Sequence, residues 1–292
     1  MLECDMPHSR VYLLGTGTCR TDLSYGQNGA CLINGPTTFI FDVGASSLER
    51  LERVGAFEQC RDLHIHISHR HTDHAIGVFP LLQCLTYSDD ARHLAVQHVT
   101  IHATQEVCDL IAQVRAVWGA EETCLATPYP GCEARTLTYR PGPNHADWRY
   151  TVSGIEIESV HLPDSNNHGI RFVSNGIRYA FTGDATALGD ALTTFCRDTD
   201  ICVFDFGHMT NRRLPDNRFE IDLSAAVDLV SHSNARTIYA SHVYVRHLQD
   251  RVLTAADREH EIARLIDETF QRAKAHGFKG KLLHAQDCLE IT

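Results

Sequence analysis

The sequence lacks the features of secreted and membrane-spanning proteins. No apolar run approaches the roughly 20 residues that a membrane helix needs, and the opening MLECDMPHSR contains neither a basic nor an apolar segment. The eleven cysteines include no C-x-x-C pair. This pattern favours reduced thiols, most of them buried as small hydrophobic side chains. We therefore expect a cytoplasmic protein without a disulfide framework.

An excess of basic charge is also missing. The chain carries 26 Lys and Arg against 37 Asp and Glu, a formal net charge of -11. Proteins that hold a long phosphate backbone usually carry a basic surface, so the composition argues against long nucleic acid as a partner while leaving room for a local basic pocket. A hydrophobic content of 43% over 292 residues is enough for a substantial core.

Histidine, in contrast, is abundant, with 19 residues, and it is concentrated in one stretch, SHRHTDHAIG, which begins at Ser68. Neutral imidazole and carboxylate are ligands of zinc and similar metals. His69 and His71 lie two apart in an extended segment, so they can point the same way and grip one metal. Asp73 and His74 can then face a second metal beside it. The preceding strand also holds His64 and His66, on the face opposite Ile65 and Ile67, and these two are expected to pack or to support the site.

The hydrophobic pattern predicts strands and helices along the whole chain. Strands are predicted at 10–15, 29–34, 38–43, 62–68, 99–103, 148–152, 155–161, 169–174, 177–183, 201–206, 237–242 and 281–285. Helices are predicted at 46–54, 75–85, 104–118, 222–232 and 255–276, with a short one ending near 195, whereas 119–147 is rich in Pro and Gly and is expected to be irregular. This order indicates a mixed α/β (α+β) fold in which two sheets stack face to face with helices outside, a four-layer αββα sandwich. We expect residues 1–292 to form a single domain.

The run His69-Arg70-His71-Thr72-Asp73-His74 reads H-x-H-x-D-H, and in this run the sequence resembles the metallo-β-lactamase superfamily. VYLLGTGTCRTDLSYGQNGACLI and FIFDVGAS are similar to the glycine turn, hairpin and D-x-G segment of the tRNase Z-like and cyclic phosphodiesterase branch. The similarity extends from residue 10 to about 250. It implies the αββα fold and a dinuclear site for two divalent metal ions, with zinc expected first and manganese or iron also compatible with the ligands.

The resemblance also assigns three later ligands. His161 in SVHLPDS resembles the third-motif histidine, Asp184 in YAFTGDAT the bridging aspartate, and His242 in TIYASHV the last histidine. It implies that one metal is held by His69, His71 and His161, the other by Asp73, His74 and His242, with Asp184 between them. His168 in NNHGIRF competes with His161 for the third motif but opens the next strand, where it is less well placed. Asp42 of the D-x-G segment is expected to support a ligand rather than to bind metal.

The interval between two of these motifs bears on the reaction. A two-metal site suits hydrolysis by a hydroxide that bridges the metals. The third-motif histidine and the bridging aspartate are 184 - 161 = 23 positions apart, whereas a tRNase Z carries a long basic arm there to grip tRNA. The sequence therefore favours a phosphodiesterase of a small cyclic nucleotide or another cyclic or linear phosphodiester. A lactone, ester or thioester hydrolase is the alternative, and a tRNase Z-type RNA 3' endonuclease is favoured less. Phosphoribosyl cyclic phosphodiesterases have a cysteine cluster at the position where this sequence has Cys19 alone. The resemblance therefore does not imply that this protein shares their substrate.

Three residues are candidates for catalysis. We expect Asp73 to bind metal and also to take part in catalysis. The general acid that protonates the leaving group is either His208, with Asp205 to orient it, or Asp222, which would need a raised pKa and otherwise reads as a helix cap. The arginines that are candidates for binding the substrate phosphate are Arg171, Arg178, Arg212 and Arg213. By resemblance alone, the protein is expected to form a homodimer.

Overall fold

Two large β-sheets face each other in the computed structural model, which describes residues 9–18, 25–117, 124–125, 135–162, 167–185, 189–216, 218–244 and 254–292. The first has strand order β17-β1-β2-β3-β4-β5-β7-β6 and the second β16-β15-β12-β11-β10-β9-β8. Their bounds are β1 Arg10–Gly15, β2 Gly29–Asn34, β3 Thr37–Phe41, β4 Asp62–His66, β5 His98–Thr104, β6 Cys124–Leu125, β7 Arg135–Gly142, β8 Trp148–Val152, β9 Ile155–Leu162, β10 Asn167–Ser174, β11 Ile177–Phe181, β12 Ile201–Asp205, β15 Thr237–Ser241, β16 Lys281–His284 and β17 Leu289–Glu290.

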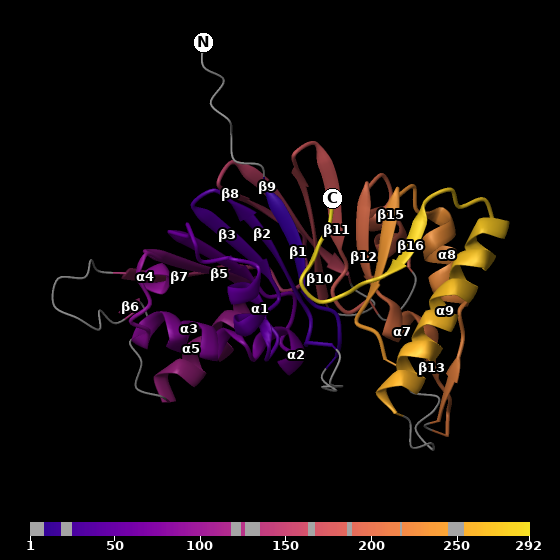
Figure 1. The fold of residues 1–292 in the computed structure, drawn as a ribbon, viewed down its shortest axis with the longest axis horizontal. Helices are drawn as coiled ribbons and strands as arrows, with labels where there is room; N and C mark the ends of the chain where they lie inside the picture. The colour runs from indigo at the N-terminus through magenta and orange to yellow at the C-terminus, as the bar shows by residue number, and fades with distance from the viewer. Residues whose placement is uncertain are drawn as a thin grey trace, which may run out of the picture.

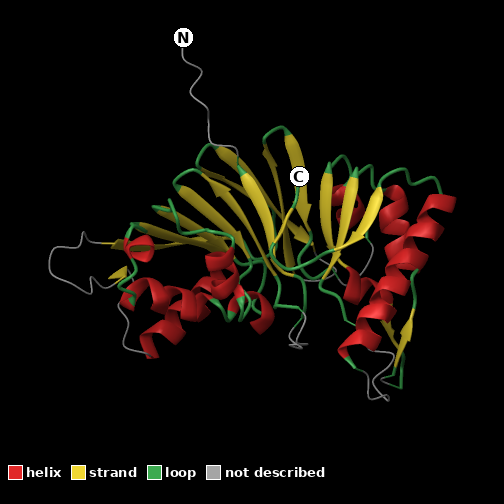
Figure 2. Ribbon diagram, in the orientation of Figure 1, coloured by secondary structure: helices red, strands yellow, loops and turns green. Residues whose placement is uncertain are grey.

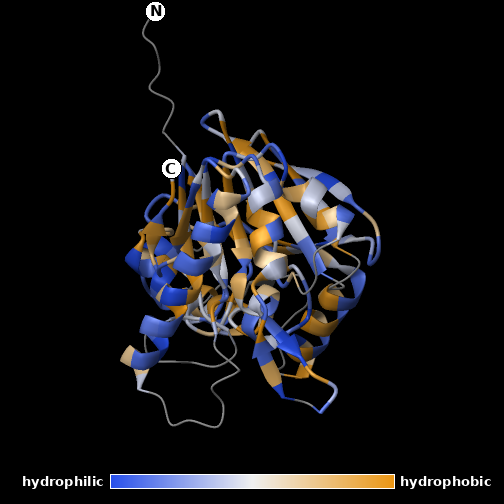
Figure 3. Ribbon diagram, turned by 90° about the vertical axis from the view of Figure 1, so that its right-hand side faces the viewer, coloured by the Kyte–Doolittle hydropathy of each residue, from blue (hydrophilic) through white to orange (hydrophobic). Residues whose placement is uncertain are grey.

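Helices cover the outer face of each sheet (Figures 1 and 2). The first sheet carries α1 Ser47–Arg53, α2 Thr72–Ala75, α3 Val78–Tyr87, α4 Ala91–Leu94 and α5 Gln105–Val117, and the second carries α6 Asp190–Cys196, α7 Phe206–Thr210, α8 Ser224–His232 and α9 Ala255–Ala275. The helices on the side of the second sheet combine hydrophilic and hydrophobic residues (Figure 3), as expected for helices with one face on a sheet and one in water. The prediction of a four-layer αββα sandwich is confirmed.

The three apolar clusters follow these layers. One lies between the first sheet and its helices, a second between the second sheet and its helices, and a third between the sheets. Strand β4 shows how the sequence produces this separation. Leu63 and Ile65 belong to the outer cluster, so the alternate residues His64 and His66 face the second sheet.

The space between the sheets is polar beside β4. His66 Nδ1 lies 2.8 Å from the Tyr150 hydroxyl, and His64 Nδ1 lies 3.0 Å from His102 Nε2. The rings of His102 and Tyr150 stack with their centroids 4.1 Å apart. Burial lowers the pKa of His102 to about 3, so this ring is neutral near neutral pH. The expected packing role of His64 and His66 agrees with these contacts.

Several predicted elements need correction. The stretch 119–147, expected to be irregular, contains β7, whose Leu137 packs among the helices of the first sheet. The predicted helix 75–85 is divided into α2 and α3, which places Gly77 at the break. A small hairpin of β13 Asn211–Arg213 and β14 Phe219–Ile221 was not expected. Cys19 lies outside the described residues.

The last part of the chain closes the first sheet. Strand β17 pairs with β1, and Ile291 N donates to Val11 O. The Asp287 carboxylate accepts hydrogen bonds from the backbone N–H groups of Thr16 and Gly26 and from the Arg50 guanidinium. One carboxylate thus ties the glycine turn after β1 to helix α1.

Among the described residues, no helix has the length and apolar character needed to cross a membrane.

Candidate metal centre

The candidate ligands follow the carboxyl ends of strands from both sheets. Strands β11, β12 and β15 run parallel, so the residues that follow them emerge at one edge, where functional groups of open α/β sheets gather. Asp184 follows β11 and His242 follows β15, while the H-x-H-x-D-H run follows β4 in the facing sheet. Helices α2 and α7 mark this edge, at the lower side of Figure 1.

Asp184 lies between two groups of side chains and turns one oxygen toward each. Its Oδ2 is 3.4 Å from His69 Nε2 and 3.5 Å from His71 Nδ1. Its Oδ1 is 2.8 Å from His74 Nε2 and 3.4 Å from His242 Nε2. Asp73 completes the second group, with Oδ2 3.2 Å from His242 Nε2. His69, His71 and Asp184 form one set of ligand atoms within 4.8 Å of one another, and Asp73, His74 and His242 form another.

The outer nitrogens of the buried rings are held in place by hydrogen bonds. His69 Nδ1 lies 2.9 Å from the Ser68 hydroxyl, which donates to Asp42 Oδ2, and His74 Nδ1 lies 2.7 Å from the same oxygen. These bonds assign the Nδ1–H tautomer to both rings and leave each Nε2 as the free electron-pair donor. Both Nε2 atoms are buried and face Asp184, with His69 Nε2 3.4 Å from Oδ2 and His74 Nε2 2.8 Å from Oδ1.

Asp42 reaches this position because of an unusual backbone. Its φ of 57° lies in the left-handed region, which is uncommon outside glycine. The next residues run directly against the metal motif, since Val43 N donates to His74 O and Gly77 N donates to Val43 O. A Cβ at Gly44 would lie 2.7 Å from Asp73 O, and one at Gly77 would lie 2.1 Å from Gly44 O. The D-x-G segment therefore fits only with glycine, and Asp42 supports His74 as expected.

Charge at the centre is strongly one-sided. Asp42, Asp73, Asp184 and Asp205 are all buried, and within the described part of the chain none of them pairs with Lys or Arg. Although burial opposes it, the carboxylates of Asp184 and Asp205 raise the pKa of His242 to about 10. Four buried carboxylates attract cations, and two divalent ions would balance them. The donors, the free Nε2 atoms and this charge therefore fit a pair of divalent metal ions.

His161 and His168 are cross-strand partners in the β9–β10 hairpin, with ring centroids 5.2 Å apart. Both ring nitrogens of His168 have partners, because Nε2 donates to Asn144 O at 3.2 Å and Nδ1 lies 3.3 Å from the Ser159 hydroxyl. His161 belongs to none of the ligand groups found among the described residues; its ring lies beside His168 and His145. The engaged nitrogens of His168 favour His161 for the third motif.

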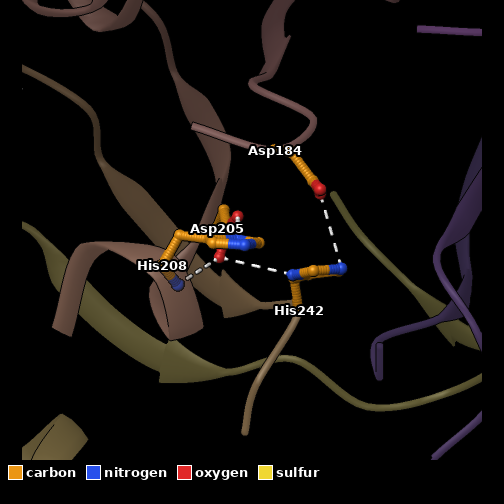
Figure 4. A group of neighbouring side chains, drawn as sticks. All are labelled: Asp184, Asp205, His208 and His242. Carbon is orange, nitrogen blue, oxygen red and sulfur yellow. Dashed lines mark hydrogen bonds and ion pairs between the residues drawn. The ribbon is translucent and has the colours of Figure 1, made fainter. Parts of the chain in front are cut away.

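His208 stands next to the second group of ligands (Figure 4). Asp205 accepts a hydrogen bond from the backbone N–H of His208 at 2.8 Å and also contacts its Nδ1. Asp205 Oδ1 lies 3.4 Å from His242 Nδ1, and the rings of His208 and His242 stack with their centroids 5.3 Å apart. Burial lowers the pKa of His208, but the Asp205 carboxylate outweighs this and raises it. The orienting role expected for Asp205 therefore agrees with the geometry.

Asp222 occupies a different environment. Its Oδ1 accepts the backbone N–H of Ser224 at 3.0 Å and contacts the Ser224 hydroxyl, and these bonds lower its pKa. A general acid needs the opposite shift. The contacts are those of a carboxylate at the start of α8, so His208 is the better placed of the two candidates.

The four arginines considered for substrate phosphate are engaged or turned elsewhere. Arg171 pairs with Glu158 at 2.6 Å and Arg178 with Asp200 at 3.1 Å. Both lie on the outer face of their sheet, because their neighbours Phe172 and Tyr179 belong to the cluster between the sheets. Arg212 pairs with Glu220 at 2.7 Å, and Arg213 is exposed on the same hairpin. The structure does not bring Arg171 or Arg178 to the metal centre.

The comparison with known families agrees with this geometry. Residues 38–243 match the Beta-lactamase superfamily domain, a range that contains every candidate ligand. The chain belongs to the β-lactamase superfamily. No curated protein matches the chain.

Solved structures show which fold this superfamily member shares. The metallo-beta-lactamase fold protein YhfI from Bacillus subtilis is 14% identical, with a TM-score of 0.63 over 97% of this chain and 98% of that one. A diphosphatase from the PhnP family is 16% identical, with a TM-score of 0.64 over 98% of both chains. The short form of human tRNase Z is 14% identical, with a TM-score of 0.63 over 97% of this chain and 98% of that one. At this identity they establish the metallo-β-lactamase fold.

The sequence did not reveal two residues of this metallo-β-lactamase-fold centre. Ser68 connects Asp42 to His69 through hydrogen bonds. Its position directly before the first histidine of the motif could have indicated this role. Tyr244, two residues after His242, places its ring 5.4 Å from that of His208. A Cβ at Gly207 would lie 2.4 Å from the Tyr244 ring, so this approach requires glycine there.

Proposed function

We propose that the protein is a two-metal hydrolase of small phosphodiesters, with a cyclic nucleotide or another cyclic or linear phosphodiester as substrate. The observation that carries this proposal is the position of Asp184. One oxygen faces His69 and His71, and the other faces His74 and His242. A carboxylate placed in this way suits two adjacent cations, an arrangement that phosphatases and nucleases use to stabilise the attacking and leaving oxygens.

The ligand assignment of this proposal follows the two groups. His69, His71 and His161 would hold one ion, and Asp73, His74 and His242 the other, with Asp184 shared between them. We infer zinc, because imidazole and carboxylate are its usual ligands, although manganese and iron accept the same set. When bound, such ions supply an acidified water as nucleophile and positive charge for the phosphoryl oxygens. The chain's own Asp42, Ser68 and Asp205 fix the rings that face the ions.

His208 supplies the proton in this proposal. Its Nδ1 is engaged by Asp205, which leaves Nε2 as the atom that can donate a proton. The ring lies at the wall of the second group, stacked on His242, and it is the more exposed of the two rings, with 26% of its side chain accessible against 3% for His242. A proton from Nε2 would neutralise the leaving alkoxide, and Asp205 would stabilise the charged ring.

The hairpin between His161 and Asp184 supports a small substrate. Strands β10 and β11 join directly through the turn at Asn175 and Gly176, both with positive φ. This part of the interval provides no arm that could grip a folded RNA. The net charge of -11 also disfavours a polyanion.

A substrate panel tests the proposal. Zinc- and manganese-loaded protein would be assayed with bis(p-nitrophenyl) phosphate, 2',3'- and 3',5'-cyclic nucleotides, an aryl ester, a lactone and a tRNA precursor. We expect turnover of one or more small phosphodiesters that is lost on chelation and restored by metal. Turnover of the lactone or ester with none of the phosphodiesters would replace the proposed substrate class, and cleavage of the tRNA precursor alone would overturn the argument from the short hairpin.

A further inference from the structure

A hollow lies on the outer face of strands β9, β10 and β11, away from the metal centre. It is a cavity of about 640 Å³, within the size range of small-molecule sites. Strands β9, β10 and β11 form its floor, and the end of α6 forms one wall with Thr194, Arg197 and Asp198. Val173 in this floor lies five residues beyond His168 along β10, which separates them by roughly 17 Å.

The floor of the cavity combines apolar surface with neutralised charge. Val173, the next-to-last residue of β10, is 53% exposed and contributes apolar surface to the floor. Beside it, Glu158 accepts two hydrogen bonds from Arg171, and Arg178 is paired with Asp200. Arg171 also lies over the Phe195 ring of α6, 5.5 Å from its centroid. Two of the four arginines that sequence analysis considered for phosphate therefore line this cavity, and each is already paired with an acidic side chain.

Arg197 differs from its neighbours. It is exposed at the end of α6, and within the described residues its side chain has no ion pair or hydrogen bond. The remaining acids of the lining keep their negative charge, since Asp198 accepts a hydrogen bond from the neutral amide of Asn234 at 3.2 Å and the exposed Glu156 lies 3.8 Å from Arg149. The cavity thus offers one uncommitted cation beside an apolar floor, and its acids would repel a ligand with several negative charges.

We infer that this cavity is a binding site for a small organic monoanion with an apolar body, separate from the metal centre. The carboxylate, sulfonate or phosphate-ester group of the ligand pairs with the Arg197 guanidinium, which presents a planar fork of donors to such oxygens. The apolar body covers Val173 and displaces water from it. Because none of the candidate metal ligands lines the cavity, occupancy does not depend on metal.

The probe for this site is 8-anilinonaphthalene-1-sulfonate, an aromatic body with one sulfonate whose fluorescence rises in apolar surroundings. Fluorescence titration of the full-length protein should give one saturable site, with the same Kd before and after EDTA treatment. Arg197→Glu and Val173→Asp should each weaken binding by about tenfold or more, as expected for loss of a charged hydrogen bond or of apolar contact. Circular dichroism and thermal melting would confirm that both variants fold.

Two matched substitutions control for general effects. Arg218→Glu changes an exposed arginine of the distant β13–β14 hairpin, and Val117→Asp changes a valine of α5 that is 83% exposed. Neither should alter the titration. Binding that is absent, that survives both cavity substitutions, or that falls equally in the control variants would overturn the site. None of these outcomes depends on catalytic activity, so the site can fail or stand apart from the proposed hydrolase function.

Discussion

Acidic side chains have opposite kinds of partner in two regions around strands β9, β10 and β11. Near the end of β11, the charged and ionisable partners of Asp184 among the described residues are histidines and another carboxylate. In the second region, Glu158 and Asp200 each meet an arginine of the same sheet. The strands are the same and their backbone pairing is regular, so the contrast lies in the side chains alone.

This difference separates charge that serves the fold from charge that needs a ligand. When an acidic side chain pairs with a nearby arginine, its charge is balanced by the protein itself. Buried carboxylates that face only imidazoles carry a desolvation cost that a cation can offset. The imbalance, more than the number of histidines, distinguishes the candidate metal centre from the histidine-rich packing around Tyr150.

The largest effect is expected from removing the shared carboxylate. Asp184→Asn deletes the negative charge that faces both ligand groups, so metal content and hydrolytic turnover should both fall below detection. Asp198→Asn, at the opposite end of the sheet, is the control and should leave both unchanged. Plasma emission spectroscopy and the substrate panel measure them; retained metal and turnover in Asp184→Asn would contradict the bridging assignment.

Removing metal should lower stability chiefly through the unbalanced carboxylates. With free metal at about a thousand times its Kd, the loaded protein gains about 4 kcal/mol over the metal-free form. In the metal-free form the His242 proton offsets part of the imbalance, because its pKa is raised to about 10. That contribution is fully present below pH 6.5 and is lost as pH rises through 10. The gap in melting temperature between the two forms should therefore widen from pH 6.5 to 10, and a constant gap would count against this account.

Replacing the proposed proton donor tests catalysis without disturbing the ligands. His208→Gln should lower kcat by on the order of 10²–10⁴-fold while metal content stays the same. His232→Gln changes an exposed histidine of α8 and should have no effect. Turnover at the normal rate in His208→Gln would remove this residue from the mechanism.

The cross-strand histidines should separate by their metal content. His161→Gln should lose one of the two metal ions. His168→Gln should keep both and lose roughly 10–100-fold in activity or affinity, as residues that support ligands do. Metal loss in His168→Gln with full content in His161→Gln would exchange their roles.

The smallest effect is expected from a substitution in β9 at the Glu158–Arg171 pair. Glu158→Gln weakens a partly exposed pair with Arg171, so the free energy of unfolding should fall by no more than about 1 kcal/mol. Urea denaturation measures this, with metal content and turnover as the comparison. A large loss of either would show that the two regions are not independent.

The sequence predicted those features that depend on neighbours along the chain. Alternation at 62–68 predicted that His64 and His66 share the face of β4 opposite Ile65, and the spacing of His69 to His74 predicted a cluster of ligand side chains. Strand β7 was missed because Pro141 and Gly142 end a segment whose alternation is otherwise regular; Gly142 leaves room for the Trp148 ring, which a Cβ would meet at 1.2 Å. The hydrogen bond from His168 to Asn144 O could not be predicted either, because Asn144 lies in a loop 24 positions earlier in the chain.

The Asp287 carboxylate has a consequence for how the protein is made. Its partners Thr16 and Gly26 lie 271 and 261 positions earlier in the chain, so they leave the ribosome long before the residue that holds them. Strand β1 likewise waits for β17 before one of its edges is covered. The nascent N-terminal sheet therefore remains open at that edge throughout translation of the second sheet, and the Asp287 carboxylate can hold the glycine turn only after every strand of both sheets except β17 has been made.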